Sequence, residues 1–507
     1  MVTNRRKNLI FGIAVFVFTV VWFSLFAVAR IDLHHDGVML KPAVDVAAGK
    51  VIFRDTFCQY GALAVWLQAL VVKIFGGELI VIQLLTVLFY GGIAVLIDRI
   101  FRRFLTFPFR LVNLGLFWGM APFYLVPFHP WSSVYALFFM LLSTECLLRG
   151  MEREDWRFHA LAGVSAACAF LARHPCGAVS FGAGVLTLIL ASAYLKRKWR
   201  NVGIFAAGSV AVLTLFVLYL VLAGAWSDYL RQCFGFVGGF AWERGGGSWE
   251  EKCSRLFPVF DGLVPPLDFF FSLLPLVCIA AGLKEFFRLT RGDPAYKPRA
   301  IEVMTVILAA LASWHQYYPV PCGRHLYWAA IPMFGVFALV CERLWRNDSR
   351  RTAYRAATVA LFLAALPAVG IRLYGAAMFL RDFGNRSTID LPGVRHLRLS
   401  AAEHELLDNL KRAYAELPPE IRARGVFNYT PDGGVSVMFP GTKFRHPMFV
   451  NWQGDVYPDY PARATEYLMT YRPPFVAVRE LQVPGYREGV FCGSLYGVPY
   501  FFYSPCD

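Results

Sequence analysis

The residues best suited to chemistry gather in one polar segment, residues 30–60, which reads RIDLHHDGVMLKPAVDVAAGKVIFRDTFCQY. It holds two histidines, four aspartates, two lysines and two arginines in a chain that is 57% hydrophobic. Charge held against a lipid bilayer is costly, so it is usually retained for a function. The segment directly follows the first long apolar run, and our functional hypothesis starts from it.

Asp36 is the candidate general base of this segment. Gly37 follows it and permits the close backbone approach that a substrate pocket often needs, and His34 and His35 precede it. A helix cap is the alternative role for Asp36, because an apolar helix could start just after it. The two histidines could bind a metal ion with Asp36, but no matching set of ligands is visible elsewhere in the sequence, which favours a pocket or surface role.

Asp55 is the second candidate catalytic acid, near the end of the same segment. It could instead pair with its neighbour Arg54 or cap a helix that begins near Phe57. Arg54, Gln59 and Tyr60 are candidates for the lining of a substrate pocket.

Two later pairs of cations fall on the same predicted side of the membrane as this segment. They are Arg173 with His174, and Arg324 with His325. An acid together with convergent cations suits transfer from a phosphate-linked donor, because the carboxylate takes the proton of an attacking hydroxyl and the cations hold the departing phosphate. The first pair could equally snorkel at a helix end, and the second flanks a predicted span, so other roles stay open for both.

The composition places this chemistry in a polytopic membrane protein. Only 17% of the 507 residues are charged, whereas soluble domains have about a quarter. The net charge of +15 could suggest nucleic acid, but the basic residues form short clusters at the ends of apolar runs. That placement is typical of loops that face the cytoplasm, so binding of nucleic acid is not expected.

We predict an α-helical polytopic protein of the bacterial cytoplasmic membrane, with about eleven spans, a cytoplasmic N-terminus and an outer C-terminus. The predicted spans are residues 9–28, 79–97, 111–128, 132–148, 160–171, 178–195, 202–223, 267–283, 301–317, 326–344 and 353–379. The first is interpreted as a retained helix rather than a cleaved signal peptide. Residues 61–75 are expected to form a surface or half-inserted helix, and part of residues 38–47 to lie on the membrane surface. The polar segment and both cation pairs then face outside.

A second domain begins where the composition becomes that of a soluble protein. Residues 1–380 form the transmembrane domain, and residues 381–507 are predicted to fold as a small extracytoplasmic α/β domain. Ser400 should cap a helix with apolar residues at helical spacing. The run GVFNYTPDGGVSVMF predicts two short strands around a turn, and PPFVAVREL predicts another strand. The motifs TPDGG and NWQGD could touch an acceptor, although turns are their default role.

The cysteines and one aromatic segment leave alternatives open. Two pairs could bridge if the outer regions face an oxidising compartment, although most of the eleven cysteines are expected to be unpaired small hydrophobes. These pairs are Cys492 with Cys506, and Cys233 with Cys253. Residues 234–249 could stack on a sugar or a polyprenyl chain or form an interfacial belt, and their three glycines lack the context of a phosphate-binding loop.

The order of these motifs resembles the GT-C superfamily of integral-membrane glycosyltransferases. A long first span precedes an outer loop with the acidic motif HHDG, then GKVIFRD, QYGAL, a helix that ends in KIFGG, and at once the next span. In particular the chain resembles the bacterial branches related to protein O-mannosyltransferases and the aminoarabinose transferases of lipid A. The AFLARHP hairpin and the GRHL turn also resemble recurring positions. The resemblance covers residues 9–380 as topology and the first hundred residues as motif.

The resemblance implies a sugar donor linked to a lipid phosphate, usually a polyprenyl phosphate, and an aspartate base in the first outer loop. The base would be Asp36 and the second loop acid Asp55, while the phosphate contacts would fall on the two cation pairs. Several such families have a glutamate where this chain has Gly37. We therefore predict no obligatory metal, and a divalent ion stays without support from the sequence.

The predicted function is an inverting glycosyltransferase that uses a polyprenyl-phosphate sugar and a glycan, lipid or protein acceptor on the outer face of the membrane. A groove between helices that opens to the membrane lipids should admit the donor. A transporter or flippase of lipid-linked sugars is the first rival, but it would need charged residues near the middle of the spans and paired half-sequences, and neither is visible. A non-catalytic GT-C-like binding protein of envelope assembly is the second rival, and the missing second acid favours it mildly.

Overall fold

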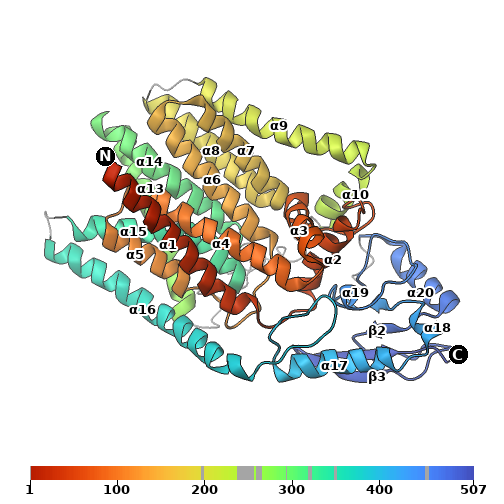
Figure 1. Cartoon of the computed structure of the whole chain (residues 1–507). Helices are drawn as coiled ribbons and strands as arrows, with labels where there is room; N and C mark the ends of the chain where they lie inside the picture. Colours follow the sequence, from red (N-terminus) through yellow and green to blue (C-terminus); the bar gives the residue numbers. More distant parts are fainter. Residues whose placement is uncertain are drawn as a thin grey trace.

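The computed structural model describes residues 2–195, 199–236, 256–258, 265–292, 294–317, 323–347, 351–451 and 456–506. Long helices form one bundle, and a smaller domain with a sheet lies against one end of it (Figure 1). The helices of the bundle are α1 (Val2–Ala27), α4 (Leu79–Phe101), α5 (Phe107–Gly119), α6 (Ser132–Arg153), α7 (Trp156–Ala172), α8 (His174–Leu195), α9 (Arg200–Leu222), α13 (Pro265–Arg291), α14 (Lys297–Trp314), α15 (Gly323–Trp345) and α16 (Arg351–Asp382). Short helical turns follow α9 at α10 (Trp226–Leu230) and η1 (Arg231–Phe236), precede α14 at η3 (Pro294–Tyr296) and follow α16 at η4 (Phe383–Asn385).

Each of the eleven predicted spans overlaps one helix of the bundle. Among the described residues, eight helices are long and apolar enough to cross a membrane: α1, α4, α6, α8, α9, α13, α15 and α16. Most of α15 is buried inside the protein, whereas most of α1, α9 and α16 is not, so α15 lies at the centre and the other three face the lipid. The prediction of an α-helical polytopic membrane protein is thus confirmed.

The predicted span 111–128 is wrong in its second half, because α5 ends at Gly119. Residues 120–131 contain three prolines and form turns instead of helix. Proline lacks the backbone N–H of a helical residue and its ring clashes with the preceding turn, which explains why the helix cannot continue. These turns bring His129 to the end of the bundle where the polar segment lies.

The polar segment folds between the bundle and the smaller domain (Figure 1). It contains α2 (His35–Ala47) and is followed by α3 (Ala62–Phe75). The 14 residues of α3 reach about 21 Å, less than the hydrocarbon thickness of a bilayer, which agrees with a helix that does not cross it.

The C-terminal domain is the predicted small α/β unit. Its elements are α17 (Ala401–Ala415), α18 (Pro419–Arg422), β1 (Phe427–Tyr429), α19 (Val435–Met438), α20 (Tyr460–Tyr471), β2 (Phe475–Ala477), β3 (Val490–Leu495) and β4 (Val498–Tyr503). The sheet has the order β1-β2-β4-β3, with β1 and β2 parallel and the other neighbours antiparallel. Ser400 caps α17 as expected: its hydroxyl accepts a hydrogen bond from the Glu403 N–H, and the Glu403 carboxylate accepts one from the Ser400 N–H at 2.7 Å.

One predicted strand of this domain is a helix. The run VSVM after the double glycine forms α19, where Val435 and Met438 are buried three residues apart while Val437 is only partly buried. A spacing of three suits a helical turn packed on one side, whereas a strand would bury every second residue. The predicted strands around Phe427 and Phe475 are present as β1 and β2.

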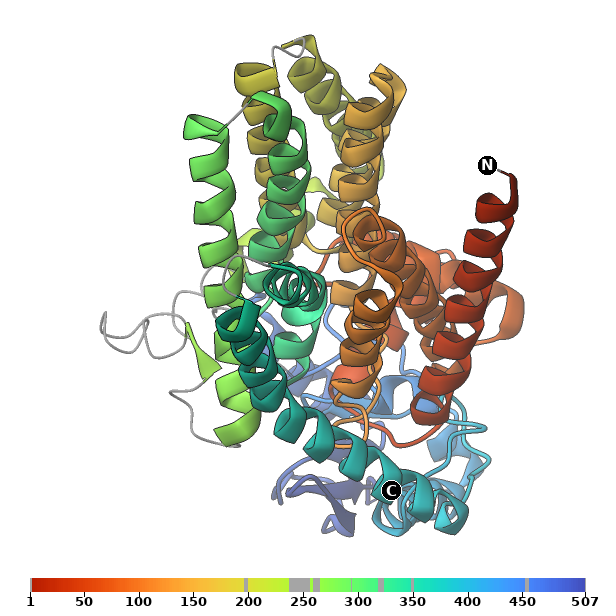
Figure 2. The same ribbon diagram turned by 90° about the vertical axis from the view of Figure 1, so that its left-hand side faces the viewer.

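Backbone contacts fix the C-terminal domain to the polar segment. The Arg30 N–H donates to the Arg398 carbonyl at 3.0 Å, and the Gly434 N–H donates to the Leu33 carbonyl at 2.8 Å. A Cβ atom on Gly37 would lie 1.8 Å from the Gly434 nitrogen, so only glycine permits this approach. Figure 2 shows the C-terminal domain and the N-terminus at opposite ends of the molecule.

Candidate functional site

The site begins where the chain leaves α1 and turns into α2. Asp32 Oδ1 accepts hydrogen bonds from the backbone N–H groups of His34 and His35, each at 3.0 Å. Asp32 thus satisfies the free amides at the start of α2, and Asp36, in its first turn, is not needed as the cap.

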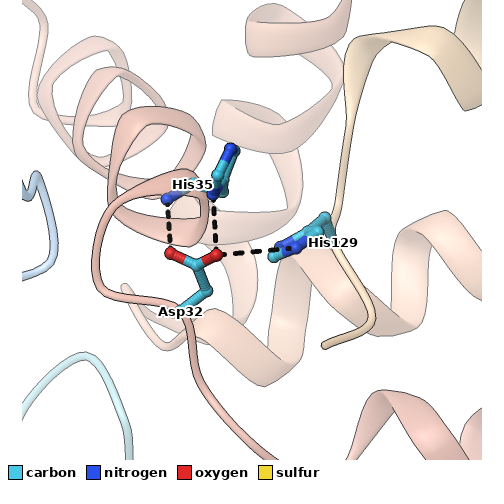
Figure 3. Close-up of side chains that lie close together, drawn as sticks. All are labelled: Asp32, His35 and His129. Atoms are coloured by element: carbon cyan, nitrogen blue, oxygen red, sulfur yellow. Dashed lines mark hydrogen bonds and ion pairs between the residues drawn. The ribbon is translucent and has the colours of Figure 1, made fainter. Parts of the chain in front are cut away.

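Two carboxylates and two imidazoles form an alternating row, here called the relay, which ends at an arginine. Asp36 Oδ1 lies 2.7 Å from His129 Nδ1, and His129 Nε2 lies 3.8 Å from Asp32 Oδ2. Asp32 Oδ2 lies 2.7 Å from His35 Nδ1, and His35 Nε2 accepts a hydrogen bond from Arg324 Nη2 at 3.1 Å. Figure 3 shows the three central side chains of the relay. The second oxygen of Asp36 accepts the Asp32 N–H at 2.9 Å.

Burial falls along the relay from one end to the other. The side chains of His129 and Asp36 are 0% and 1% exposed, whereas those of Asp32 and His35 are 16% and 30% exposed. A substrate can therefore approach the relay at Asp32 and His35, and Asp36 lies at its closed end.

The electrostatics differ along the same row. Burial raises the pKa of Asp36 well above its usual value, and the nearby charge of Asp32 adds to this rise. Burial also works to raise the pKa of Asp32, but the hydrogen bond from His35 and the charges of both imidazoles outweigh it and lower that pKa. Burial lowers the pKa of His35 to about 4 and, with the charge of Arg324, that of His129 to about 3. The lowered pKa values of both imidazoles leave them neutral near pH 7, and these imidazoles separate a carboxylate of lowered pKa, Asp32, from one of raised pKa, Asp36.

An aromatic wall links the relay to a second arginine. The Trp131 ring lies 5.3 Å from that of His35 and 5.1 Å from that of Tyr60. The Arg173 guanidinium lies 5.8 Å from the centre of the Tyr60 ring and donates to the Ser133 hydroxyl. Two of the predicted phosphate contacts, Arg173 and Arg324, thus flank one aromatic wall. Gln59 donates to the Tyr60 hydroxyl at 2.9 Å, which orients that ring.

Asp55 lies apart from the relay. Its carboxylate forms a two-pronged ion pair with Arg54, with both distances at 2.9 Å, and accepts the Val51 N–H at 2.8 Å. The hydrogen bond from Arg54 lowers the pKa of Asp55. Asp55 lines a cavity of about 140 Å³ between the polar segment and the C-terminal domain, together with Lys41, Asp45 and Lys50.

The remaining predicted site residues contact other parts of the fold. His34 Nδ1 lies 3.0 Å from the Pro431 carbonyl and 3.3 Å from Asp432, so the TPDGG motif contacts the polar segment. His174 lies 2.9 Å from the Tyr229 hydroxyl, and the His325 ring lies 5.4 Å from that of Trp328.

Two relay residues, Asp32 and His129, were not among the predicted site residues. Asp32 belongs to the same polar segment, and its charge was the available signal. His129 follows an apolar run, and a lone histidine before a proline carries no signal of a partner 93 positions away.

The other open predictions have mixed outcomes. Cys492 is buried and Cys506 exposed, and both are free thiols rather than a disulfide. Cys253, the glycines 245–247, most of the aromatic segment 234–249 and residues 452–455 of NWQGD lie outside the described residues.

Asp32, His35 and His129 form one group in the described part of the chain whose donor atoms could hold a metal ion, since they lie within 4.8 Å of one another. His129 suits this role, because its Nδ1 faces a carboxylate and its Nε2 has no hydrogen-bond partner. His35 does not, because the Arg324 N–H occupies its Nε2 and so leaves its proton on Nδ1, the atom that a metal would need. The group therefore fits a metal centre poorly and is part of a row of carboxylates and imidazoles in which the 3.8 Å step from Asp32 to His129 Nε2 is not a hydrogen bond.

Comparisons with known proteins support the fold. The chain matches no protein-family model and no curated protein sequence. It is similar to the crystal structure of ArnT from Cupriavidus metallidurans in the apo state, with a TM-score of 0.50, 14% identity and 98% of each chain covered. The structure of the same protein bound to undecaprenyl phosphate gives a TM-score of 0.49, 16% identity and 97% coverage of each chain. At this identity the likeness concerns the fold alone: the chain has the fold of ArnT, in agreement with the architecture that its motifs predicted.

Proposed function

We propose that the protein is a glycosyltransferase that moves a sugar from a polyprenyl-phosphate donor to an acceptor hydroxyl, with inversion, on the outer face of the cytoplasmic membrane. The observation that carries the proposal is the relay from buried Asp36 to partly exposed His35, next to Arg324. The GT-C fold around it supports the same reaction class.

Sugar transfer needs a base, because the acceptor hydroxyl loses its proton as its oxygen bonds to the anomeric carbon and the bond to phosphate breaks. The partly exposed carboxylate of Asp32 takes this proton and passes it to His129 Nε2 once the 3.8 Å between these two groups has shortened to hydrogen-bond distance, while His129 Nδ1 gives its own proton to the ionised carboxylate of Asp36. The raised pKa of Asp36 makes it the group that retains the proton until the products leave. Asp36 thus acts as the base through His129.

The departing phosphate needs positive charge that is already in place. Arg324 and Arg173 lie on the two sides of the wall formed by Trp131 and Tyr60. Guanidinium groups bind phosphate through paired N–H donors, so this wall is the proposed seat of the donor phosphate. The donor's tail is a lipid, which explains why the site lies at the end of helices that face the bilayer.

The cavity of about 140 Å³ beside the C-terminal domain is the proposed seat of the acceptor. Lys41 and Asp45, which line it, lie on the same helix as His35, and six residues of helix separate His35 from Lys41 by about 9 Å. Asn428 and His446 of the C-terminal domain line its other side. A polar cavity of this kind suits the hydroxyl groups of a glycan, whether free or carried by a lipid or a protein.

The proposal is tested with the purified full chain, a panel of labelled polyprenyl-phosphate sugars and a membrane extract as acceptor. A glycosyltransferase releases polyprenyl phosphate and labels an acceptor. A transporter would move the donor across proteoliposomes without releasing the phosphate, and a non-catalytic protein would bind the donor without consuming it. Either of these last two results would refute the proposed function.

A further inference from the structure

A wide cavity is bounded by parts of three helices, α1, α4 and α6. Figure 1 shows the start of α1 at the end of the bundle that is far from the C-terminal domain. The cavity has a volume of about 1080 Å³ and is lined by the first half of α1 and the last turns of α4 and α6. Four arginines line it: Arg99, Arg102, Arg149 and Arg153. Apolar side chains of α1 form the facing wall, and two of them, Leu9 and Ile13, are 64% and 56% exposed.

The packing of α1 creates this cavity. Phe11 rests on α5, with its ring 5.6 Å from that of Phe107 and 4.8 Å from the guanidinium of Arg110. Further along, α1 meets α4 so closely that a Cβ atom on Gly91 would lie 2.7 Å from the Phe16 ring. Between these two contacts α1 presents an open face to α4 and α6, and the side chains of all three helices line the cavity. The open face includes Gly12, where an added Cβ atom would meet nothing within 4 Å.

The positive charge of the cavity is only partly matched by carboxylates. Asp98 also lines it, but Asp98 is held by Arg110 at 2.8 Å. Arg149 pairs with Glu145 at 2.7 Å. In the described part of the chain, neither Arg102 nor Arg153 forms an ion pair with a carboxylate, although the Arg153 guanidinium lies over a phenylalanine ring.

The two halves of the lining point to one class of ligand. A small soluble anion would use the arginines but would leave Leu9 and Ile13 without a partner, and an uncharged lipid would leave the arginines unmatched. A phosphate head group carrying hydrocarbon chains satisfies both. We propose that this cavity binds the head group of an anionic, phosphate-bearing membrane lipid, whose chains lie along the exposed face of α1. This inference does not depend on the relay or on the proposed reaction.

The test uses the delipidated full chain in a neutral detergent, with phosphatidylglycerol as the probe and binding counted by native mass spectrometry. The first variant, Gly12→Phe, fills the cavity with a ring and leaves every arginine in place. The second, Arg102→Gln with Arg153→Gln, removes two charges without stripping a partner from Asp98 or Glu145. The matched control is Arg291→Gln with Arg351→Gln, which removes two exposed arginines at other helix ends.

We expect the wild type and the control to bind phosphatidylglycerol equally well and well above zwitterionic phosphatidylcholine. Each arginine near a head group contributes on the order of 1 kcal/mol, so the double charge variant should bind about thirtyfold more weakly. Gly12→Phe should lose binding to a similar extent. Polyprenyl phosphate is then added in competition with phosphatidylglycerol, and the lipid that binds more tightly of these two is the natural occupant. Equal binding by all variants, or displacement of the lipid by inorganic phosphate alone, would overturn the proposal.

Discussion

Asp36→Asn is the substitution that most directly tests the relay. The amide nitrogen can replace Oδ1 and donate to His129 Nδ1, now at 2.7 Å, while the amide oxygen can accept the Asp32 N–H, now at 2.9 Å. The variant therefore copies the protonated form of Asp36 in shape and hydrogen bonding. It differs in one respect, because an amide can neither take up nor release the proton.

The expected loss follows from this single change. A positioned acid or base contributes about 10²–10⁴ to the rate, or about 3–5 kcal/mol of activation free energy. Asp36 lies at the closed end of the relay and away from the arginines that are proposed to hold the donor phosphate. We therefore expect kcat to fall by about 10²–10⁴, while the donor Kd stays within about twofold of the wild type.

The assay measures release of polyprenyl phosphate and, in parallel, binding of the donor. Glu403→Gln is the matched control, because Glu403 is also a buried carboxylate that accepts a backbone N–H of the polar segment, from Ile31 at 3.2 Å, but it lies outside the relay. The control should keep kcat within about threefold. If Asp36→Asn also keeps wild-type kcat, the relay is not the path of the proton and Asp32 alone becomes the base.

Three further predictions concern stability, domain contact and metal binding. The pKa of Asp36 is raised in the folded protein, so Asp36 stabilises the fold fully only below its unfolded pKa of about 3.9, and this contribution is lost as the pH rises towards the folded pKa. Asp36→Asn should therefore be more stable than the wild type at pH 7, by about 1.4 kcal/mol for each unit by which the pKa is raised. Thermal melts should show this gain at pH 7 and no gain at pH 4. Gly37→Ala should destabilise the contact between α2 and the C-terminal domain by about 1–3 kcal/mol or more, because the new Cβ would overlap the Gly434 nitrogen. In limited proteolysis this variant should be cut faster than the control Gly384→Ala, where a Cβ meets nothing within 4 Å. Chelators should leave sugar transfer unchanged. Arg324→Gln should bind zinc more tightly than the wild type in calorimetry, because His35 then loses both the N–H that fixes its proton on Nδ1 and a nearby positive charge. Equal zinc affinity of the two proteins would contradict this view of His35.

The sequence was most informative where composition alone decides the structure. Hydropathy located a helix at each of the eleven predicted spans, because a lipid environment requires long apolar runs. The crowding of charge in residues 30–60 indicated the segment that contains Asp36 and His35, because charged residues are rare in a chain adapted to lipid. The hydrophobic pattern did not predict the end of α5, because the run 111–128 is apolar throughout apart from Asn113, and the break comes from Pro122 and Pro127.

The details of the site depended on contacts that a single sequence does not reveal. Asp36 meets His129 only because the turns after α5 fold back over α2. Gly37 was expected to admit a substrate, but the space beside it is filled by the glycines of the C-terminal domain. Asp55 lies close to Asp36 in sequence, yet α2 carries it to a different cavity.

The attachment of the polar segment to the C-terminal domain has a consequence for biosynthesis. Leu33 and Arg30, which flank Asp32, form backbone hydrogen bonds with Gly434 and Arg398, which come more than three hundred residues later in the chain. A ribosome adds about 5–20 residues per second, so these partners emerge roughly 20–80 s after the segment they hold. The nascent protein thus inserts its first helices with Asp32 and Asp36 still unplaced, and the site is completed only once the last domain has folded and docked.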